Sequence, residues 1–184
     1  MRITGGSARG QILKTLPGLL VRPTTDKARE AIFSMLSSLA SDWSRVLDLF
    51  AGTGALGIEA LSRDAEYADF VDQNGKCCQI IKQNLTKTGF ADKGRVYCSP
   101  VMKAIGMLDN SYGIIFLDPP YADTTLGAVI KSIDGSKLLN EESVIVASHS
   151  AHSPLDDRLG SLLKIREKRY GDTGITIYRK EVIS

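Results

Sequence analysis

The sequence has few of the features that mark secreted or membrane-bound chains. It contains three cysteines, an odd number with no Cys-x-x-Cys spacing, which excludes a disulfide framework and the commonest zinc sites. No run approaches the ~18 apolar residues of a membrane span, and the N-terminus lacks the apolar stretch of a signal peptide. We therefore expect a cytoplasmic protein with reduced, structural thiols and no contact with membranes.

Strong overall basicity, the usual mark of nucleic-acid binding, is also missing, because the net charge is only +2. The distribution of charge is more informative. Residues 1–45 carry a balance of +4, residues 46–160 of −5, and residues 161–184 of +3. A basic beginning and end would suit an RNA backbone while a cationic cofactor occupies the acidic centre. Ordinary scatter of surface charge gives the same balance, so charge alone leaves both interpretations open.

From residue 46 onwards, apolar strand-like runs alternate with helix-like segments. The length of 184 residues favours one ordinary domain. The expected strands are 46–50, 67–71, 95–98, 114–117 and 143–147, and the expected helices are 55–63, 75–88, 101–108 and 123–133. This alternation predicts right-handed βαβ units, and hence an α/β fold with a mostly parallel, doubly wound sheet. Two later runs, 162–168 and 175–179, are joined by a glycine turn and predict an antiparallel C-terminal ending.

The first 23 residues differ from the rest because they are short and interrupted by glycine. They predict a small β-hairpin extension outside the core, followed by the main domain over 24–184. A helix is expected from about Thr25, with Thr24, Thr25 and Asp26 all suitable as its N-cap. Its apolar stripe consists of Ala28, Ile32, Met35, Leu36 and Leu39.

A glycine-rich loop follows the first expected strand. Gly52 and Gly54 permit positive φ and close approach of a ligand, and Gly57 permits tight packing of a helix on a strand. The spacing also matches the dinucleotide-binding fingerprint. Asp48, inside the strand, would meet a positively charged ligand group and repel a diphosphate, or it would brace the loop and the following helix. Asp72, at the end of the second strand, suits a ribose diol.

A second motif, Asp-Pro-Pro-Tyr, follows the buried run 114–117. The prolines form a rigid turn that presents the Asp118 carboxylate and a neighbouring carbonyl as paired acceptors for an exocyclic amine. Holding both N–H groups would aim the nitrogen lone pair at an incoming methyl group. Tyr121 offers a flat face on which an unstacked base can lie. A proline-rich turn with a structural Asp is the alternative, and the glycine loop upstream argues against it.

With both motifs in place, the chain resembles the bacterial 16S rRNA (guanine-N2)-methyltransferases of the small-subunit type. The resemblance covers nearly the whole chain. It rests on Met1-Arg2-Ile3 with Gly5-Gly6 and Arg9-Gly10, the run from Arg22 to Asp26 followed by Arg29-Glu30-Ala31, the run from Leu47 to Gly57 followed by Glu59 to Arg63, and Asp118 to Tyr121.

The resemblance implies a Rossmann-like class I methyltransferase that uses S-adenosylmethionine to make one N2-methylguanine during small-subunit assembly. Asp118, Pro119, Pro120 and Tyr121 would receive the guanine amine. The cofactor would be bound by Asp48, Phe50, Ala51, Gly52, Thr53, Gly54, Asp72, Gln73 and Ser99. Ser99 stands where similar enzymes usually place the acid that binds the adenine amine, so this contact departs from the family pattern.

The expected partner is 16S rRNA or the assembling 30S subunit, bound by a monomer. Contacts to RNA are expected from the basic residues of the first segment, Arg2, Arg9, Lys14 and Arg22. His149 and His152 lie three residues apart, but no cluster of further ligands completes a metal site, so no metal is expected and both are predicted on the surface or in loops.

Two other functions remain possible from the sequence. A DNA adenine or cytosine amino-methyltransferase shares the Asp-Pro-Pro-Tyr motif, although 184 residues leave little room for a target-recognition region. A nicotinamide-dependent oxidoreductase shares the glycine loop, although the chain offers neither a separate substrate domain nor an obvious residue for hydride chemistry.

Overall fold

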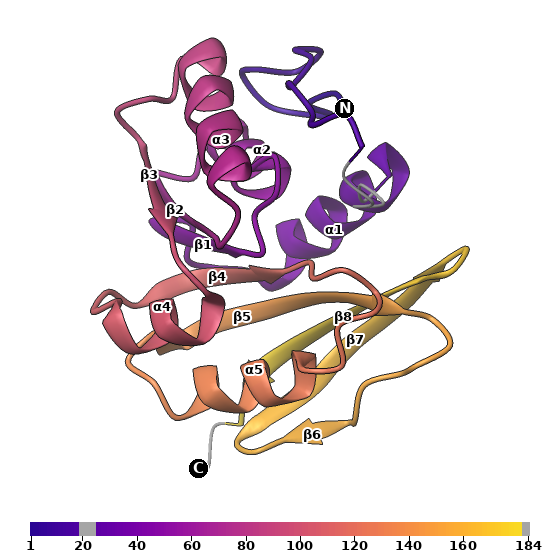
Figure 1. Ribbon diagram of the computed structural model, residues 1–184. Helices are drawn as coiled ribbons and strands as arrows, with labels where there is room; N and C mark the ends of the chain where they lie inside the picture. The colour runs from indigo at the N-terminus through magenta and orange to yellow at the C-terminus, as the bar shows by residue number, and fades with distance from the viewer. Residues whose placement is uncertain (19–24, 182–184) are drawn as a thin grey trace.

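A mixed eight-stranded sheet forms the centre of the molecule (Figure 1). The computed structural model describes residues 1–18 and 25–181. The strands are β1 (Arg45–Leu49), β2 (Tyr67–Asp72), β3 (Gly94–Cys98), β4 (Tyr112–Leu117), β5 (Leu139–Ser150), β6 (Arg158–Leu159), β7 (Leu162–Tyr170) and β8 (Thr173–Lys180). Their order is β3-β2-β1-β4-β5-β8-β7-β6. The first five pair in parallel and the last three in antiparallel fashion, which confirms the predicted α/β fold and its C-terminal reversal.

Helices cover both faces of the sheet (Figure 1). They are α1 (Asp26–Leu39), α2 (Ala55–Ser62), α3 (Gly75–Thr88), α4 (Val101–Met107) and α5 (Leu126–Asp134). The first three pack on one face and the last two on the other. Of the three suitable residues, Thr25 is the N-cap of α1, and its Oγ1 accepts a hydrogen bond from Ala28 N at 3.2 Å. Within the described residues, no helix has both the length and the apolar character needed to cross a membrane.

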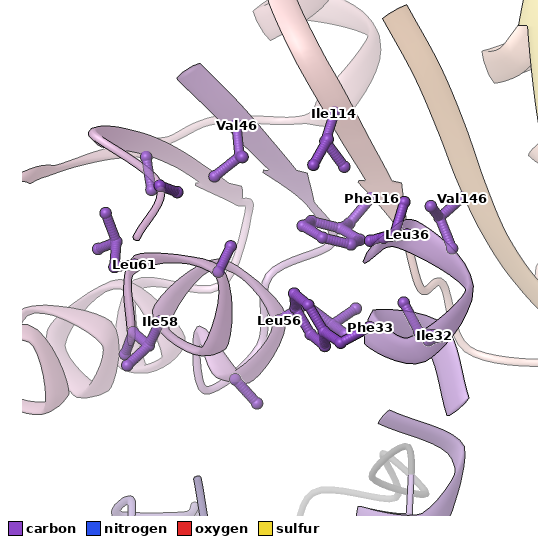
Figure 2. Packing of buried hydrophobic residues seen from close by; sticks show 14 of the residues in the cluster. Ile32, Phe33, Leu36, Val46, Leu56, Ile58, Leu61, Ile114, Phe116 and Val146 are labelled. Carbon is purple, nitrogen blue, oxygen red and sulfur yellow. The ribbon is translucent and has the colours of Figure 1, made fainter. Parts of the chain in front are cut away.

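The central parallel strands β1, β2 and β4 are buried on both sides, which β4 illustrates. Ile114 and Phe116 face α1 and α2, whereas Ile115 and Leu117 face α4 and α5. Figure 2 shows the first of these faces, where Phe116 meets Phe33 of α1 with ring centroids 5.7 Å apart. The continuous apolar runs in the sequence are explained by this double burial.

Differences from the predicted elements lie at their ends. The helix predicted from residue 123 begins at Leu126, because the Asp123 carboxylate accepts the Thr125 N–H and holds those residues in a turn. Strand β5 is longer than the predicted run 143–147. The two-residue strand β6 was not predicted, since so short a segment has no periodicity.

The N-terminal segment is antiparallel, as predicted, but it is not outside the core. Its pairing is limited to an isolated bridge between Arg2 and Ile12 with flanking backbone hydrogen bonds. Ile3, Ala8 and Leu13 are at most 2% exposed and belong to the same apolar cluster as α1 and α2. The expectation that the hairpin is not a core element was wrong, because isolated apolar residues among glycines give no periodic signal of burial. The boundary predicted between residues 23 and 24 lies outside the described residues.

A buried carboxylate, Glu59 of α2, anchors this segment. Glu59 is fully buried and accepts hydrogen bonds from Thr4 N at 2.9 Å, Thr4 Oγ1 at 2.6 Å and Gly5 N at 2.8 Å. Arg63 Nε also donates to Glu59, at 2.9 Å. At Gly6, with φ +78°, a Cβ would lie 1.6 Å from the Ser62 carbonyl oxygen, so the approach to α2 requires glycine.

We predict that Glu59→Ala lowers the free energy of unfolding by about 3–5 kcal/mol, because Arg63 and the backbone N–H groups lose their buried partner. Urea denaturation measures this change. Limited trypsin digestion should cut the variant after Arg9 or Lys14 faster than the parent. Glu66→Ala, at an exposed position four residues past α2, is the matched control. An equal loss of unfolding free energy in Glu59→Ala and Glu66→Ala would contradict the role of Glu59 as the anchor of the N-terminal segment.

Candidate active site

The site lies where the order of the parallel strands reverses, between β1 and β4. Leu49 of β1 pairs with Leu117 of β4, so both strands end at the same level. Phe50 and Asp118, the next residues, therefore leave the sheet beside each other. Carboxyl ends of strands at such a reversal are the usual ligand site of an open α/β sheet.

The glycine loop after β1 departs from ordinary backbone geometry. Gly52 and Gly54 have φ of 58° and 79°, as their glycine identity predicted, and Phe50 has φ 61°. A left-handed conformation in a bulky residue costs about 1–3 kcal/mol and is concentrated at functional sites. A Cβ at Gly52 would meet no atom within 4 Å, so open space lies in front of it. At Gly57 a Cβ would lie 2.3 Å from the Phe70 ring, which confirms close packing of α2 on β2.

Asp48 serves the loop and faces the site at the same time. It is 1% exposed, and its Oδ2 accepts the Gly57 N–H at 2.9 Å. Burial raises the pKa of Asp48 well above its usual value, and the nearby carboxylates of Asp118 and Asp72 raise it further. The residue braces the beginning of α2, and it also lines the cavity described below. The two roles that the sequence left open for Asp48, bracing the loop and facing a cationic ligand group, are therefore compatible.

The residues predicted at the ends of β2 and β3 lie together but outside the cavity lining. Asp72 Oδ2 accepts the Gly52 N–H and Oδ1 accepts the Asn74 N–H, both at 2.8 Å. Ser99 is buried, and its N–H donates to the Asp72 carbonyl at 3.0 Å. Gln73 is exposed. Asp72 therefore holds the glycine loop by a hydrogen bond to Gly52, and the residue remains partly open to solvent.

The Asp-Pro-Pro-Tyr turn places its members differently. Asp118 is half-buried and lines the cavity, Pro119 is buried, and Pro120 is exposed. The Pro120 carbonyl accepts the Asp123 N–H at 2.8 Å. Tyr121 is 37% exposed, and its hydroxyl is hydrogen-bonded to Oγ1 of Thr173, the first residue of β8. The hydroxyl group of Tyr121 is therefore held in place, while part of the side chain is open to solvent.

A cavity of about 260 Å³ lies between the loop and the turn. Six predicted residues line it: Asp48, Phe50, Ala51, Gly52, Thr53 and Asp118. The other predicted cofactor and catalytic residues do not: Gly54, Asp72, Gln73, Ser99, Pro119, Pro120 and Tyr121. Seven lining residues were not predicted as cofactor or catalytic residues: Met1, Thr15, Leu16, Arg29, Ala55, Leu56 and Cys77. The N-terminal segment and α1 thus contribute to the wall.

Arg29 is the unpredicted residue with the clearest sequence signal. It lies three residues before Ile32 and seven before Leu36, which puts a charge on the apolar stripe of α1. The side chain is fully buried, and its Nη2 donates to Asp26 Oδ1 at 2.6 Å and to the Arg2 carbonyl. Burial lowers the pKa of Arg29 from its usual value, while Asp26, Glu59 and Asp118 oppose that change.

The predicted RNA-contact residues Arg2, Arg9 and Lys14 are exposed. Arg22 lies outside the described residues. The backbone of Lys14 is held by the fully buried Asn84 of α3, whose amide also donates to the Thr53 carbonyl of the glycine loop at 2.9 Å. The basic segment is therefore joined directly to the loop.

The two histidines do not share an environment. His149 was predicted on the surface or in a loop, and this was wrong, because it lies in β5 at 5% exposure. Its Nε2 is 2.8 Å from Thr176 Oγ1 and its Nδ1 is 2.9 Å from the Ser150 carbonyl. A histidine in the sequence does not by itself indicate that its side chain will be buried against β8. His152 is exposed, with Nε2 3.4 Å from Asp172 Oδ1.

The sheet order, the cavity at the strand ends and the full-length relatives reported below define the class of protein, an S-adenosylmethionine-dependent methyltransferase. The chain belongs to the family described as "Conserved hypothetical protein 95", whose model matches residues 1–179.

Named relatives agree with this class. "Putative rRNA methyltransferase YlbH" of Bacillus subtilis is 41% identical over 183 residues, covering 98% of this chain and 99% of the relative. "Ribosomal RNA small subunit methyltransferase D" of Escherichia coli K12 is 33% identical over 181 residues, covering 98% of this chain and 90% of the relative. The solved "Putative methyltransferase yhhF from Escherichia coli" superposes with a TM-score of 0.86 at 32% identity, covering 98% of each chain.

We predict that iodoacetamide at pH 8 labels Cys98 rapidly and Cys77 and Cys78 slowly in the folded protein. Cys98 is exposed and the other two are buried. Burial raises the pKa of the Cys77 thiol to about 11 and that of Cys78 to about 12, so little reactive thiolate exists at pH 8. Mass spectrometry of timed samples measures each site, and labelling in urea is the control that should equalise them. Rapid native labelling of Cys77 would contradict its burial.

Proposed function

We propose that this chain transfers a methyl group from S-adenosylmethionine to the exocyclic N2 of a guanine in 16S ribosomal RNA, during small-subunit assembly. The observation that carries the proposal is that Asp118 and the glycine loop line one cavity at the ends of adjacent strands. The printed names of two relatives, a small-subunit and a putative rRNA methyltransferase, supply the substrate class.

The described residues suit this cofactor. Open space in front of Gly52 leaves room for a ligand against the backbone. Asp48 places a carboxylate in the cavity wall, where a cationic amino-acid head is favourable and a diphosphate is not. S-adenosylmethionine supplies the methyl group on a sulfonium, which needs no acid to assist its departure. Phe50, Ala51 and Thr53 complete the wall on this side, while Asp72, Gln73 and Ser99 would bind the ribose and the adenine at its open edge.

The turn after β4 would orient the amine. The Pro120 carbonyl accepts the Asp123 N–H, so the second acceptor would be a carbonyl earlier in the turn, beside the Asp118 carboxylate. Two acceptors match the two N–H groups of an exocyclic amine and point its lone pair away from them. Because that lone pair is delocalised into the ring, orientation rather than basicity limits the reaction, and well-placed reactants recover about 7–11 kcal/mol. Asp118 or water accepts the proton that the amine loses.

Binding of the base and of the RNA would involve separate parts of the site. Tyr121 offers an exposed aromatic face, and stacking of a base on such a face contributes about 1–3 kcal/mol. This contribution offsets part of the cost of unstacking the guanine. Arg2, Arg9, Lys14 and Arg22 would contact phosphates of 16S rRNA, and the link from Lys14 through Asn84 to Thr53 would set the RNA against the catalytic loop.

The two alternatives receive less support. A nicotinamide cofactor would bring its diphosphate to a cavity that contains Asp48 and Asp118. A DNA amino-methyltransferase fits the same turn, but the relatives named above at 41% and 33% identity carry RNA in their names. A methyl-transfer assay with both nucleic acids separates the three functions.

In a tritium-methyl transfer assay, we expect the protein to label 30S particles and nuclease digestion to yield N2-methylguanosine. Asp118→Ala should lower the rate by at least about 10³-fold, because the amine is no longer oriented. Its affinity for S-adenosylhomocysteine should stay near normal in calorimetry.

Asp92→Ala, at an exposed position away from the cavity, is the control for removal of a carboxylate and should retain activity. Label in methyladenosine or in DNA, or stabilisation by NAD instead of S-adenosylhomocysteine, would overturn the proposed function. An active Asp118→Ala protein would overturn the mechanism alone.

We also predict a positioning role for Thr173. Thr173→Val removes the hydroxyl that holds Tyr121 while keeping the shape of the side chain. We expect kcat/KM for 30S particles to fall about fivefold, the worth of one hydrogen bond, mainly through KM, with unchanged S-adenosylhomocysteine affinity. Thr173→Ser should restore the rate. A Ser variant as impaired as the Val variant would show that packing, rather than the hydroxyl, is responsible.

A further inference from the structure

Arg29 has hydrogen-bonding capacity that the described protein does not use. Its side chain is fully buried and lines the cavity. Nε and Nη1 are both buried, and among residues 1–18 and 25–181 neither finds a hydrogen-bond partner. Buried donors without acceptors are rare and cost free energy, so a buried guanidinium in this condition at a cavity wall indicates a missing ligand group.

The guanidinium is also fixed in position. Nη2 is held by the Asp26 carboxylate and by the Arg2 carbonyl. Arg29 itself lies in the first turns of α1, whose beginning is capped by Thr25. The remaining donors are therefore presented in one orientation before any ligand binds, and little side-chain entropy is lost when they are used.

The charged side chains of the cavity wall form a complementary set for one ligand. Asp48, Asp118 and Arg29 provide two carboxylates and one guanidinium. S-adenosylmethionine carries an ammonium, a sulfonium and one carboxylate. The two cationic groups of the ligand thus correspond to the two carboxyl groups of the wall, and its carboxylate corresponds to Arg29, the cation of the set.

We propose that Arg29 binds the carboxylate of the methionyl group and thereby makes the site specific for cofactors with an intact amino-acid head. This inference rests on the proposed function, since it concerns the same cofactor. A guanine O6 is the other acceptor that could reach a buried arginine, but it is neutral. A carboxylate offers two oxygens to the two unused donors, Nε and Nη1, and a charge-assisted contact is about twice as strong as a neutral one.

Isothermal titration calorimetry with S-adenosylhomocysteine and its decarboxylated analogue tests the proposal. The analogue keeps the amine and lacks only the carboxylate. The unmodified protein should bind the analogue about ten- to a hundredfold more weakly. Arg29→Met should lose this discrimination, because its affinity for S-adenosylhomocysteine falls to that of the analogue. Lys27→Met, an equal change of charge at an exposed position of the same helix, should keep it.

Arg29→Lys keeps the proposal testable if the Met variant does not fold, which circular dichroism would reveal. Lysine retains the cation but not the fixed planar donors, so we expect discrimination of an intermediate size. A variant that binds both ligands more weakly by the same factor would show a structural role and overturn the proposal.

Unchanged discrimination in Arg29→Met would also overturn it. If that variant instead no longer distinguishes guanine from 2-aminopurine at the target nucleotide, Arg29 recognises the base. Failure of the proposed function is distinguishable: a different cofactor would leave the unmodified protein unable to bind either ligand, whereas a different methyl acceptor would leave the discrimination between the two ligands intact.

Discussion

The parallel pairing of β1 with β4 is the constraint on which the rest of the site depends. These strands are far apart in the sequence, yet the pairing of Leu49 with Leu117 brings both carboxyl ends to one level. The glycine loop leaves one strand and the Asp-Pro-Pro-Tyr turn leaves the other. A shift of register would carry Asp118 away from the loop and also turn the buried faces of β4 over, because side chains alternate along a strand.

A second set of contacts converts this open edge into a cavity. Glu59 binds Thr4 and Gly5, and Asn84 binds Lys14 and Thr53, so the N-terminal segment is attached to α2, to α3 and to the loop. Met1, Thr15 and Leu16 then form part of the cavity wall. The segment that carries the basic residues is thus structurally part of the cavity wall.

Sequence reasoning succeeded where a residue acts through a local property. Gly52 and Gly54 have positive φ and Gly57 packs against Phe70, each as expected from its type and position, and Asp48 braces the start of α2, one of the two roles left open for it. It failed where the burial of a residue depends on contacts with segments distant in the sequence. Ile3 and Leu13 lie in the core although no periodicity marks them, and His149 is enclosed between β5 and β8 rather than exposed.

The sequence by itself determined the α/β class and the position of the two motifs at strand ends, because these follow from periodicity and from local backbone chemistry. The tertiary structure decided which residues meet. It placed Arg29 of α1 in the same wall as Asp48 and Asp118, and it joined Tyr121 to Thr173 of β8. Contacts between residues so distant in the chain depend on packing and strand order, which no local pattern encodes.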